Sequence, residues 1–224
     1  MSSIFARAMG EDFSRLHPML QKRFGVGLED GYACVGTGTM RRIRRGPWWT
    51  VPFLQIGRLR SILVPDHGEN IPFRIENYPY RDRLGRETVT FVREYRIRGR
   101  MRRFDATMIA GRRTGRIVDY LGTHQHLAVD LELHAEPDGS LLLRSDAQRF
   151  YEGPIAFRFP MLFSGRAELR ESFDDDTGEY RVSLEVRNRV FGFLFGYDGA
   201  FRCEFPDAVD APERLKPRRT ESRE

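Results

Sequence analysis

The sequence is poor in cysteine and lysine and has no long apolar run. Its 224 residues include two cysteines, Cys34 and Cys203, and two lysines, Lys22 and Lys216. So few cysteines fit a reduced intracellular protein rather than a disulfide framework. No apolar run approaches the roughly 20 residues of a spanning helix, and the first ten residues lack the basic start and apolar segment of a secretory signal. We expect a cytoplasmic protein that does not span a membrane.

The positive charge is almost entirely arginine. Lys and Arg total 37 and Asp and Glu total 32, so the net charge is 37 − 32 = +5. A nucleic-acid binder usually gathers its basic residues on one face, with aromatic residues between them. Here the arginines are spread over several predicted strands and turns, with acidic residues close by. The pattern therefore favours a solvated surface, and we expect no nucleic-acid partner.

The first 24 residues carry apolar positions at the spacing of a helical stripe, from Ile4 to Phe24. Gly10 and the His17-Pro18 step interrupt the stripe, because proline disfavours helical geometry in the preceding residue. The pattern predicts short helices within residues 3–24. His17, at the break, is typical of a capping or packing residue rather than a catalytic one.

After Gly31 the apolar period changes to two, which indicates strands. Apolar residues alternate with polar ones over 87–98, 103–110, 127–133 and 167–187, and turn residues separate these runs at Pro137-Asp138-Gly139, Asp174 to Gly178 and Asp198-Gly199. One-sided alternation is typical of antiparallel sheets with one wet face. We therefore predict a mainly β protein: a strongly curved antiparallel sheet or barrel-like meander with short N-terminal helices. We expect a single domain over residues 1–206, followed by a flexible tail over 207–224.

Two patterns could suggest cofactors or metals, and neither is specific. Gly36-Thr37-Gly38 lacks the third glycine and the following helix of a dinucleotide site, so a strand kink that needs small residues explains it better. His124 and His126 would share one face of a strand with Asp130, but that face is the wet one. We expect no cofactor and no metal.

Three charged residues interrupt apolar rows. Arg93 lies between Phe91 and Tyr95, Asp119 between Ile117 and Leu121, and Glu171 between Leu169 and Phe173. A buried, unpaired charge is strongly destabilising, so each needs a partner, water or a ligand. In one interpretation Arg93 forms a structural ion pair with Glu171 or Asp119. In the other, the rows line a cavity and the charges orient a ligand.

The second interpretation is our leading hypothesis for the function. A small apolar or amphipathic molecule would bind in the concave face, with Arg93 anchoring an anionic group and Tyr197 supplying a hydroxyl. An enzyme using Asp119 or Glu171 as a general acid or base is the first alternative, and a structural or interaction module with a solid core is the second. The candidate ligand-binding residues are Arg93, Tyr95, Phe104, Met108, Asp119, Glu171, Phe193, Phe195 and Tyr197.

Six short motifs occur along the chain in the same order as in one bacterial family. They are Phe5-Ala6-Arg7-Ala8-Met9-Gly10, Leu16-His17-Pro18, Gly36-x-Gly38-x-Met40-x-x-Ile43-x-x-Gly46, Val92-Arg93-Glu94-Tyr95, Ile117-Val118-Asp119-x-Leu121-Gly122 and Gly192-x-Leu194-Phe195-x-Tyr197-x-Gly199-x-Phe201. Over about residues 3–205 the chain thus resembles the bacterial domain-of-unknown-function 4166 family. The resemblance implies a bacterial domain that occurs alone or attached to membrane or reductase-like partners, and it implies no activity.

Overall fold

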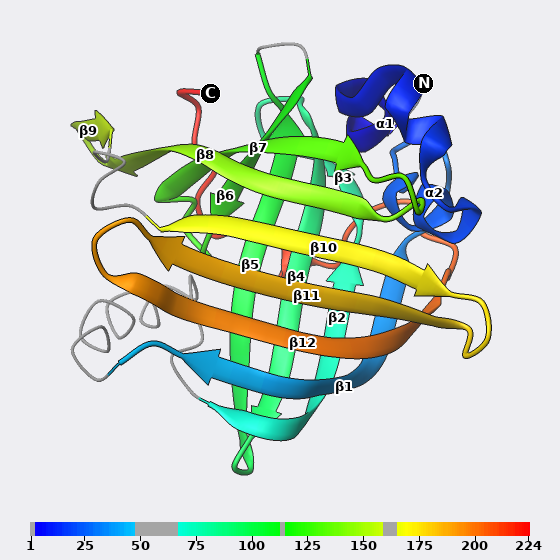
Figure 1. Ribbon diagram of the computed structural model, residues 1–224. Coiled ribbons are helices and arrows are strands. Elements are labelled where there is room, and N and C mark those ends of the chain that lie inside the picture. Colours follow the sequence, from blue (N-terminus) through cyan, green and yellow to red (C-terminus); the bar gives the residue numbers. More distant parts are fainter. Residues whose placement is uncertain (1–2, 48–66, 113–114, 159–164) are drawn as a thin grey trace.

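The computed structural model describes residues 3–47, 67–112, 115–158 and 165–224, which form mainly β-strands (Figure 1). The helical elements are α1 (Ile4–Met9), the 3-10 helices η1 (Gly10–Arg15) and η3 (Glu213–Leu215), and α2 (Pro18–Phe24). The strands are β1 (Cys34–Arg45), β2 (Gly68–Asn77), β3 (Pro79–Arg81), β4 (Glu87–Ile97), β5 (Arg100–Ala110), β6 (Arg116–Leu121), β7 (Leu127–Ala135), β8 (Leu141–Glu152), β9 (Ile155–Arg158), β10 (Arg166–Asp174), β11 (Glu179–Asn188) and β12 (Gly192–Glu204).

The sheet closes on itself. Within the described ranges, ten antiparallel strands form a ring in the order β10-β11-β12-β1-β2-β4-β5-β6-β7-β8, and β8 pairs back onto β10. Strands β3 and β9 lie outside the ring, paired with β4 and β8. Closure pairs the edge strands that an open sheet would expose. The predicted mainly β, barrel-like fold with N-terminal helices is therefore confirmed.

The alternating pattern decides which side chains face the interior. On β4 the residues Val89, Phe91, Arg93 and Tyr95 all belong to the inward row, and all are buried. Successive strand residues point to opposite faces, so a period of two in the sequence becomes one inner and one outer surface. The large apolar core lies inside the barrel.

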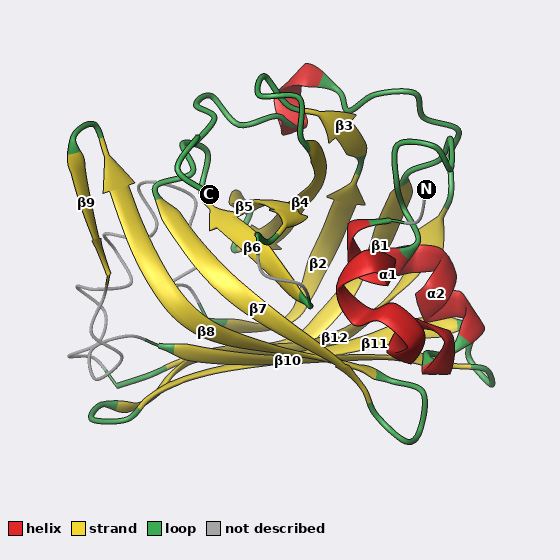
Figure 2. Ribbon diagram, turned by 90° about the horizontal axis from the view of Figure 1, so that it is seen from above, coloured by secondary structure: helices red, strands yellow, loops and turns green. Residues whose placement is uncertain are grey.

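The N-terminal helices close one part of the barrel (Figure 2). Phe5 of α1 packs edge-on against Phe24 of α2, with ring centroids 5.1 Å apart, and against Phe91 of β4 at 5.8 Å. His17 caps α2, because its Nδ1 accepts a hydrogen bond from the Met19 amide at 3.2 Å. The expected helix break and the capping histidine are thus both present. No helix in the described residues is long and apolar enough to cross a membrane.

One expected turn is wrong. Asp198-Gly199 does not separate two strands, because β12 runs without a break from Gly192 to Glu204. Opposite these residues β1 has a bulge between Met40 and Arg42. A Cβ on Gly199 would lie 2.6 Å from the Met40 Cα, so glycine permits this close approach of two backbones.

The C-terminal residues 207–224, which we expected to be flexible, pack against the outside of the barrel. Leu215 and Glu221 are each 2% exposed, and the Glu221 amide donates to the Gln125 side chain at 2.7 Å. Arg86 donates to the backbone oxygen of Glu221 at 2.8 Å. Tertiary contacts therefore hold a segment whose own composition is poor in apolar residues.

Candidate functional site

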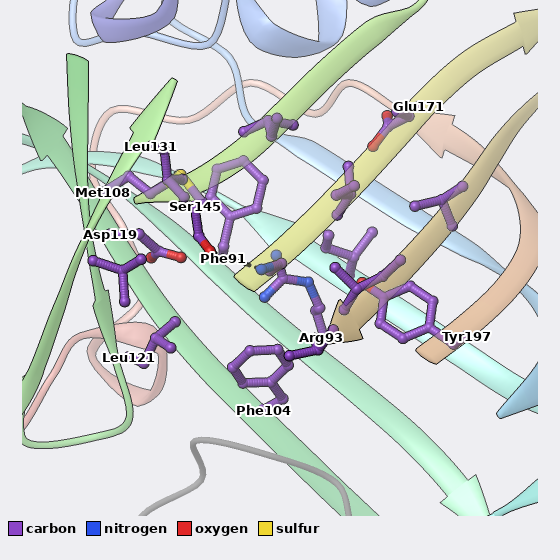
Figure 3. A pocket seen from close by; sticks show the side chains of 18 of the residues that line it. Phe91, Arg93, Phe104, Met108, Asp119, Leu121, Leu131, Ser145, Glu171 and Tyr197 are labelled. Carbon is purple, nitrogen blue, oxygen red and sulfur yellow. Dashed lines mark hydrogen bonds between the residues drawn. The ribbon is translucent and has the colours of Figure 1, made fainter. Parts of the chain in front are cut away.

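The barrel interior contains a partly open cavity of about 230 Å³ (Figure 3). This exceeds the roughly 150 Å³ of an apolar protein cavity that binds benzene. Most of the wall consists of leucine, valine and aromatic side chains from the strands, and α1 and α2 contribute Phe5, Arg23 and Phe24. The polar or charged side chains of the wall are Arg23, Arg93, Asp119, Ser145, Gln148, Glu171 and Tyr197.

Arg93 reaches the cavity from β4. Its side chain is buried, and its Nη1 has no hydrogen-bond partner in the described part of the chain. The guanidinium carbon lies 4.8 Å from the ring centroid of Phe104 and 5.6 Å from that of Phe91. Aromatic faces attract a cation, but they leave its hydrogen-bonding capacity unused. Arg93 can therefore still bind an acceptor.

Asp119 reaches the same cavity from β6. Its carboxyl group is buried, and its Oδ1 has no hydrogen-bond partner among the residues described. Burial raises the pKa of this carboxyl to about 7, and the positive charge of Arg93 opposes the shift. Removing a carboxylate from water disfavours its ionised form. Asp119 can thus hold or release a proton near neutral pH.

Strand β5 separates the two residues. Arg93 pairs in register with Phe104, whereas Asp119 pairs with Met108. Between these two levels β5 carries the small residue Ala106, whose register partners Phe91 and Leu121 both line the cavity. In the described residues no ion pair joins Arg93 to Asp119, although the charge of Arg93 still affects the carboxyl. Figure 3 shows both side chains directed into the interior from different strands.

Glu171 is held by a different arginine. The Arg23 Nε of α2 donates to the Glu171 Oε1 of β10, and both side chains are almost fully buried. Arg23 also donates to the Asn77 Oδ1 at 2.8 Å and to the Cys34 Sγ at 3.1 Å. Burial raises the pKa of Glu171, against the charges of Arg23 and Arg93. The expected pairing of Arg93 with Glu171 or Asp119 is therefore absent from the described structure.

Seven of the nine residues named from the sequence line the cavity: Arg93, Phe104, Met108, Asp119, Glu171, Phe195 and Tyr197. Tyr95 belongs to the inward row of β4 but does not line the cavity, and its ring lies 6.2 Å from that of Tyr197. Phe193 lies outside the lining, and the Arg44 guanidinium is 5.2 Å from its ring. A bulge places Phe195 opposite Val186 but Phe193 opposite Arg187, so Leu194 is the extra residue and lines the cavity instead.

Arg23 is the main functional candidate that the sequence did not reveal. It lies in the last turn of α2, where a basic residue is ordinary. Its role depends on the helix docking against β10, which no local pattern specifies. Ser145 and Gln148 of β8 were missed for a similar reason: β8 has a register irregularity opposite β7, so strict alternation fails there.

The glycine pair and the histidine pair that the sequence offered as possible cofactor or metal motifs have structural explanations. A Cβ on Gly36 would lie 2.7 Å from atoms of both Ile75 and Phe201, so this position needs a small residue. His126 is 3% exposed rather than on a wet face, because the C-terminal segment covers it and Arg219 lies 3.2 Å from its Nδ1. The described residues contain no group of three metal-binding side chains.

These features define a class of protein: an antiparallel β-barrel with an apolar internal cavity that holds a few charged groups. Residues 16–201 match the model of the family described as "Domain of unknown function (DUF4166)", and the chain belongs to this family. It is 31% identical over 204 residues to "Uncharacterized protein YndH" of Bacillus subtilis (strain 168), covering 91% of this chain and 98% of that protein. The solved structure of Rv2717c from M. tuberculosis aligns with 84% of this chain and 99% of that chain, at 12% identity and a TM-score of 0.35.

Proposed function

We propose that the barrel binds a small, largely apolar molecule in its cavity. The observation that carries this proposal is the combination of an internal space of about 230 Å³ with the buried Arg93, whose Nη1 faces that space without a partner in the described structure. Apolar pockets with a few convergent polar groups are typical of small-molecule sites. A solid structural core would leave no such space.

Each part of the wall has a role in this proposal. Arg93 holds an anionic or acceptor group of the ligand, because a buried guanidinium is stabilised by any acceptor that replaces lost water. Phe104, Met108 and Phe195 contact the apolar body of the ligand. Tyr197 supplies a hydroxyl group, and its burial raises the pKa of that hydroxyl, so it remains a neutral donor.

Two measurements on the wild-type protein and a substitution on β4 test the proposal. Native mass spectrometry of wild-type protein from its own host should reveal a copurifying small molecule, and calorimetric titration should detect binding of octanoate or 1-naphthoate. Arg93→Met should remove the bound molecule with little loss of stability. Arg96→Met is the matched control, because Arg96 is exposed on the outer face of the same strand. The proposal is wrong if the wild-type protein carries no molecule and binds no apolar probe.

Asp119 favours a second candidate function, general acid–base catalysis. Its pKa of about 7 suits a group that exchanges a proton near neutral pH, whereas Glu171 is held by Arg23. Incubating a recovered host molecule with the wild-type protein in D₂O would distinguish the two functions by NMR. An enzyme would exchange or convert the molecule and Asp119→Asn would not, whereas a binding protein would leave it unchanged.

A further inference from the structure

We propose that the ligand is an apolar monocarboxylate and that Asp119 takes up a proton when the carboxylate binds between it and Arg93. This inference rests on the proposed function and names the ligand class of the same cavity. It follows from the sum of the charges at the cavity wall, from the placement of Arg93 and Asp119, and from the ability of Asp119 to change its protonation state.

The net charge of the cavity wall can be balanced by one singly charged anion. Arg23 and Glu171 form an ion pair, so together they contribute no net charge. Arg93 is positive, and Asp119 is the remaining charged group of the described wall. When Asp119 is protonated, the cavity carries one net positive charge. A ligand with a single negative charge neutralises it, whereas a dianion or a cation would leave a buried charge uncompensated.

The surroundings of Asp119 let it change its protonation state. Its neighbours across the ladder are Met108 on β5 and Val129 on β7, both of which are apolar and line the cavity. Arg93 is the charged group whose field reaches the carboxyl, and burial already holds its pKa near 7. A bound carboxylate would add a second negative charge nearby and raise this pKa further.

A protonated Asp119 complements Arg93 as a donor. A carboxylate has two oxygens that accept hydrogen bonds, and the protonated carboxyl donates an O–H while the guanidinium donates an N–H. Phe104, on β5, faces Arg93 across the ladder and lies under its guanidinium. The ligand's apolar body then extends along Phe195 and the leucine side chains of the wall.

Calorimetric titration of the full-length protein tests the inference with two matched pairs of probes, octanoate with octan-1-ol and 1-naphthoate with 1-naphthylmethanol. Both carboxylates are ionised above about pH 6, so any proton taken up belongs to the protein. We expect at least one carboxylate to bind about tenfold or more tightly than its alcohol. Its affinity should fall by up to about tenfold per pH unit above pH 7. Titrations in phosphate and in Tris at about pH 8 should show net uptake approaching one proton.

Two variants show which residue is responsible for each of these effects. Asp119→Asn keeps a neutral donor and should make carboxylate affinity independent of pH, with no proton uptake. Arg93→Met should remove the preference for carboxylate over alcohol. Equal binding of acids and alcohols by the wild-type protein would overturn the inference while leaving the proposed function intact, and so would a pH dependence that persists in Asp119→Asn. Binding of none of the four probes would overturn the inference, and it would overturn the proposed function as well if native mass spectrometry also found no copurified molecule.

Discussion

The Arg23 guanidinium, from the last turn of α2, forms an ion pair with the Glu171 carboxylate inside the barrel wall. This contact joins the N-terminal helix to β10 and neutralises Glu171, one of the two carboxylates that the sequence offered as a partner for Arg93. Because Glu171 has its own partner, Arg93 keeps a hydrogen-bonding group directed into the cavity. The helix thus stabilises the fold and also decides which arginine is available to a ligand.

Breaking the Arg23–Glu171 pair should be strongly destabilising. Arg23→Met or Glu171→Gln leaves the partner buried without its counter-charge, and each should lower the free energy of unfolding by about 3–5 kcal/mol. The double variant Arg23→Met/Glu171→Leu should lose less than the sum of the two single changes. Urea unfolding measures all three values.

The exposed pair Arg144–Glu168 provides the comparison. Its atoms are 2.9 Å apart and both side chains are more than half exposed, so the same double-mutant cycle there should give at most about 1 kcal/mol of coupling. Equal coupling energies for the two pairs would contradict the structural role of Arg23.

Asp119 should make stability depend on pH. Its pKa in the folded protein, about 7, is higher than the ordinary value near 4, so the native state binds more protons between these pH values. Wild-type stability should therefore fall as pH rises from about 4 to about 7 and then level off. Asp119→Asn cannot ionise, so its stability relative to wild type should rise by about 2–3 kcal/mol between pH 5 and pH 8, as measured by urea unfolding.

Asp138→Asn is the control for this pH effect. Hydrogen bonds from Ser140 hold the pKa of the Asp138 carboxyl below its ordinary value, so both folded and unfolded states are ionised from pH 5 to pH 8. Its stability difference from wild type should stay constant over that range. If Asp119→Asn also gave a constant difference, the pKa of Asp119 would not be raised.

Gly38→Ala should destabilise the barrel by about 1–3 kcal/mol through overpacking. A Cβ at this position would collide with the carbonyl oxygen of Ala200 and lie 2.5 Å from the Phe201 Cα, both on the neighbouring strand β12. Thermal unfolding measures the loss. Thr37→Ala, at the exposed neighbouring position, should change stability little, and equal effects of the two substitutions would refute the close-packing explanation.

Glu221 should stabilise the C-terminal segment above acidic pH. Burial raises the pKa of its carboxyl, but hydrogen bonds and charges from Arg223 and Arg219 outweigh this and lower the pKa to about 2. Because the folded-state pKa is depressed, the stabilisation exists above the ordinary pKa and is lost as pH falls toward 2.

Glu221→Gln should therefore destabilise the protein at pH 7, and the difference should shrink at about pH 3. Thermal unfolding and limited proteolysis of the C-terminus measure both effects. Ser222→Ala removes a neighbouring side chain and should leave both unchanged. Rapid cleavage after residue 207 in the wild-type protein would instead support the flexible tail expected from composition.

Much of the fold could be predicted from periodicity. The rows containing Phe91, Arg93 and Tyr95 on β4, and Leu169 and Glu171 on β10, repeat every two residues, and strand geometry makes such a row one face of a sheet. The prediction failed where the period breaks. A bulge moved Phe193 out of the wall and Leu194 into it, and a continuous strand replaced the Asp198-Gly199 turn.

The sequence by itself determined that Arg93, Asp119 and Glu171 interrupt apolar rows, because alternation along a strand is a local property of the chain. Only the tertiary structure decided what each charge meets. Ring closure placed the three residues around one cavity, and docking of α2 brought Arg23 to Glu171 from 148 positions away. Partners so distant in the chain are chosen by packing of the whole barrel rather than by the pattern of any one strand.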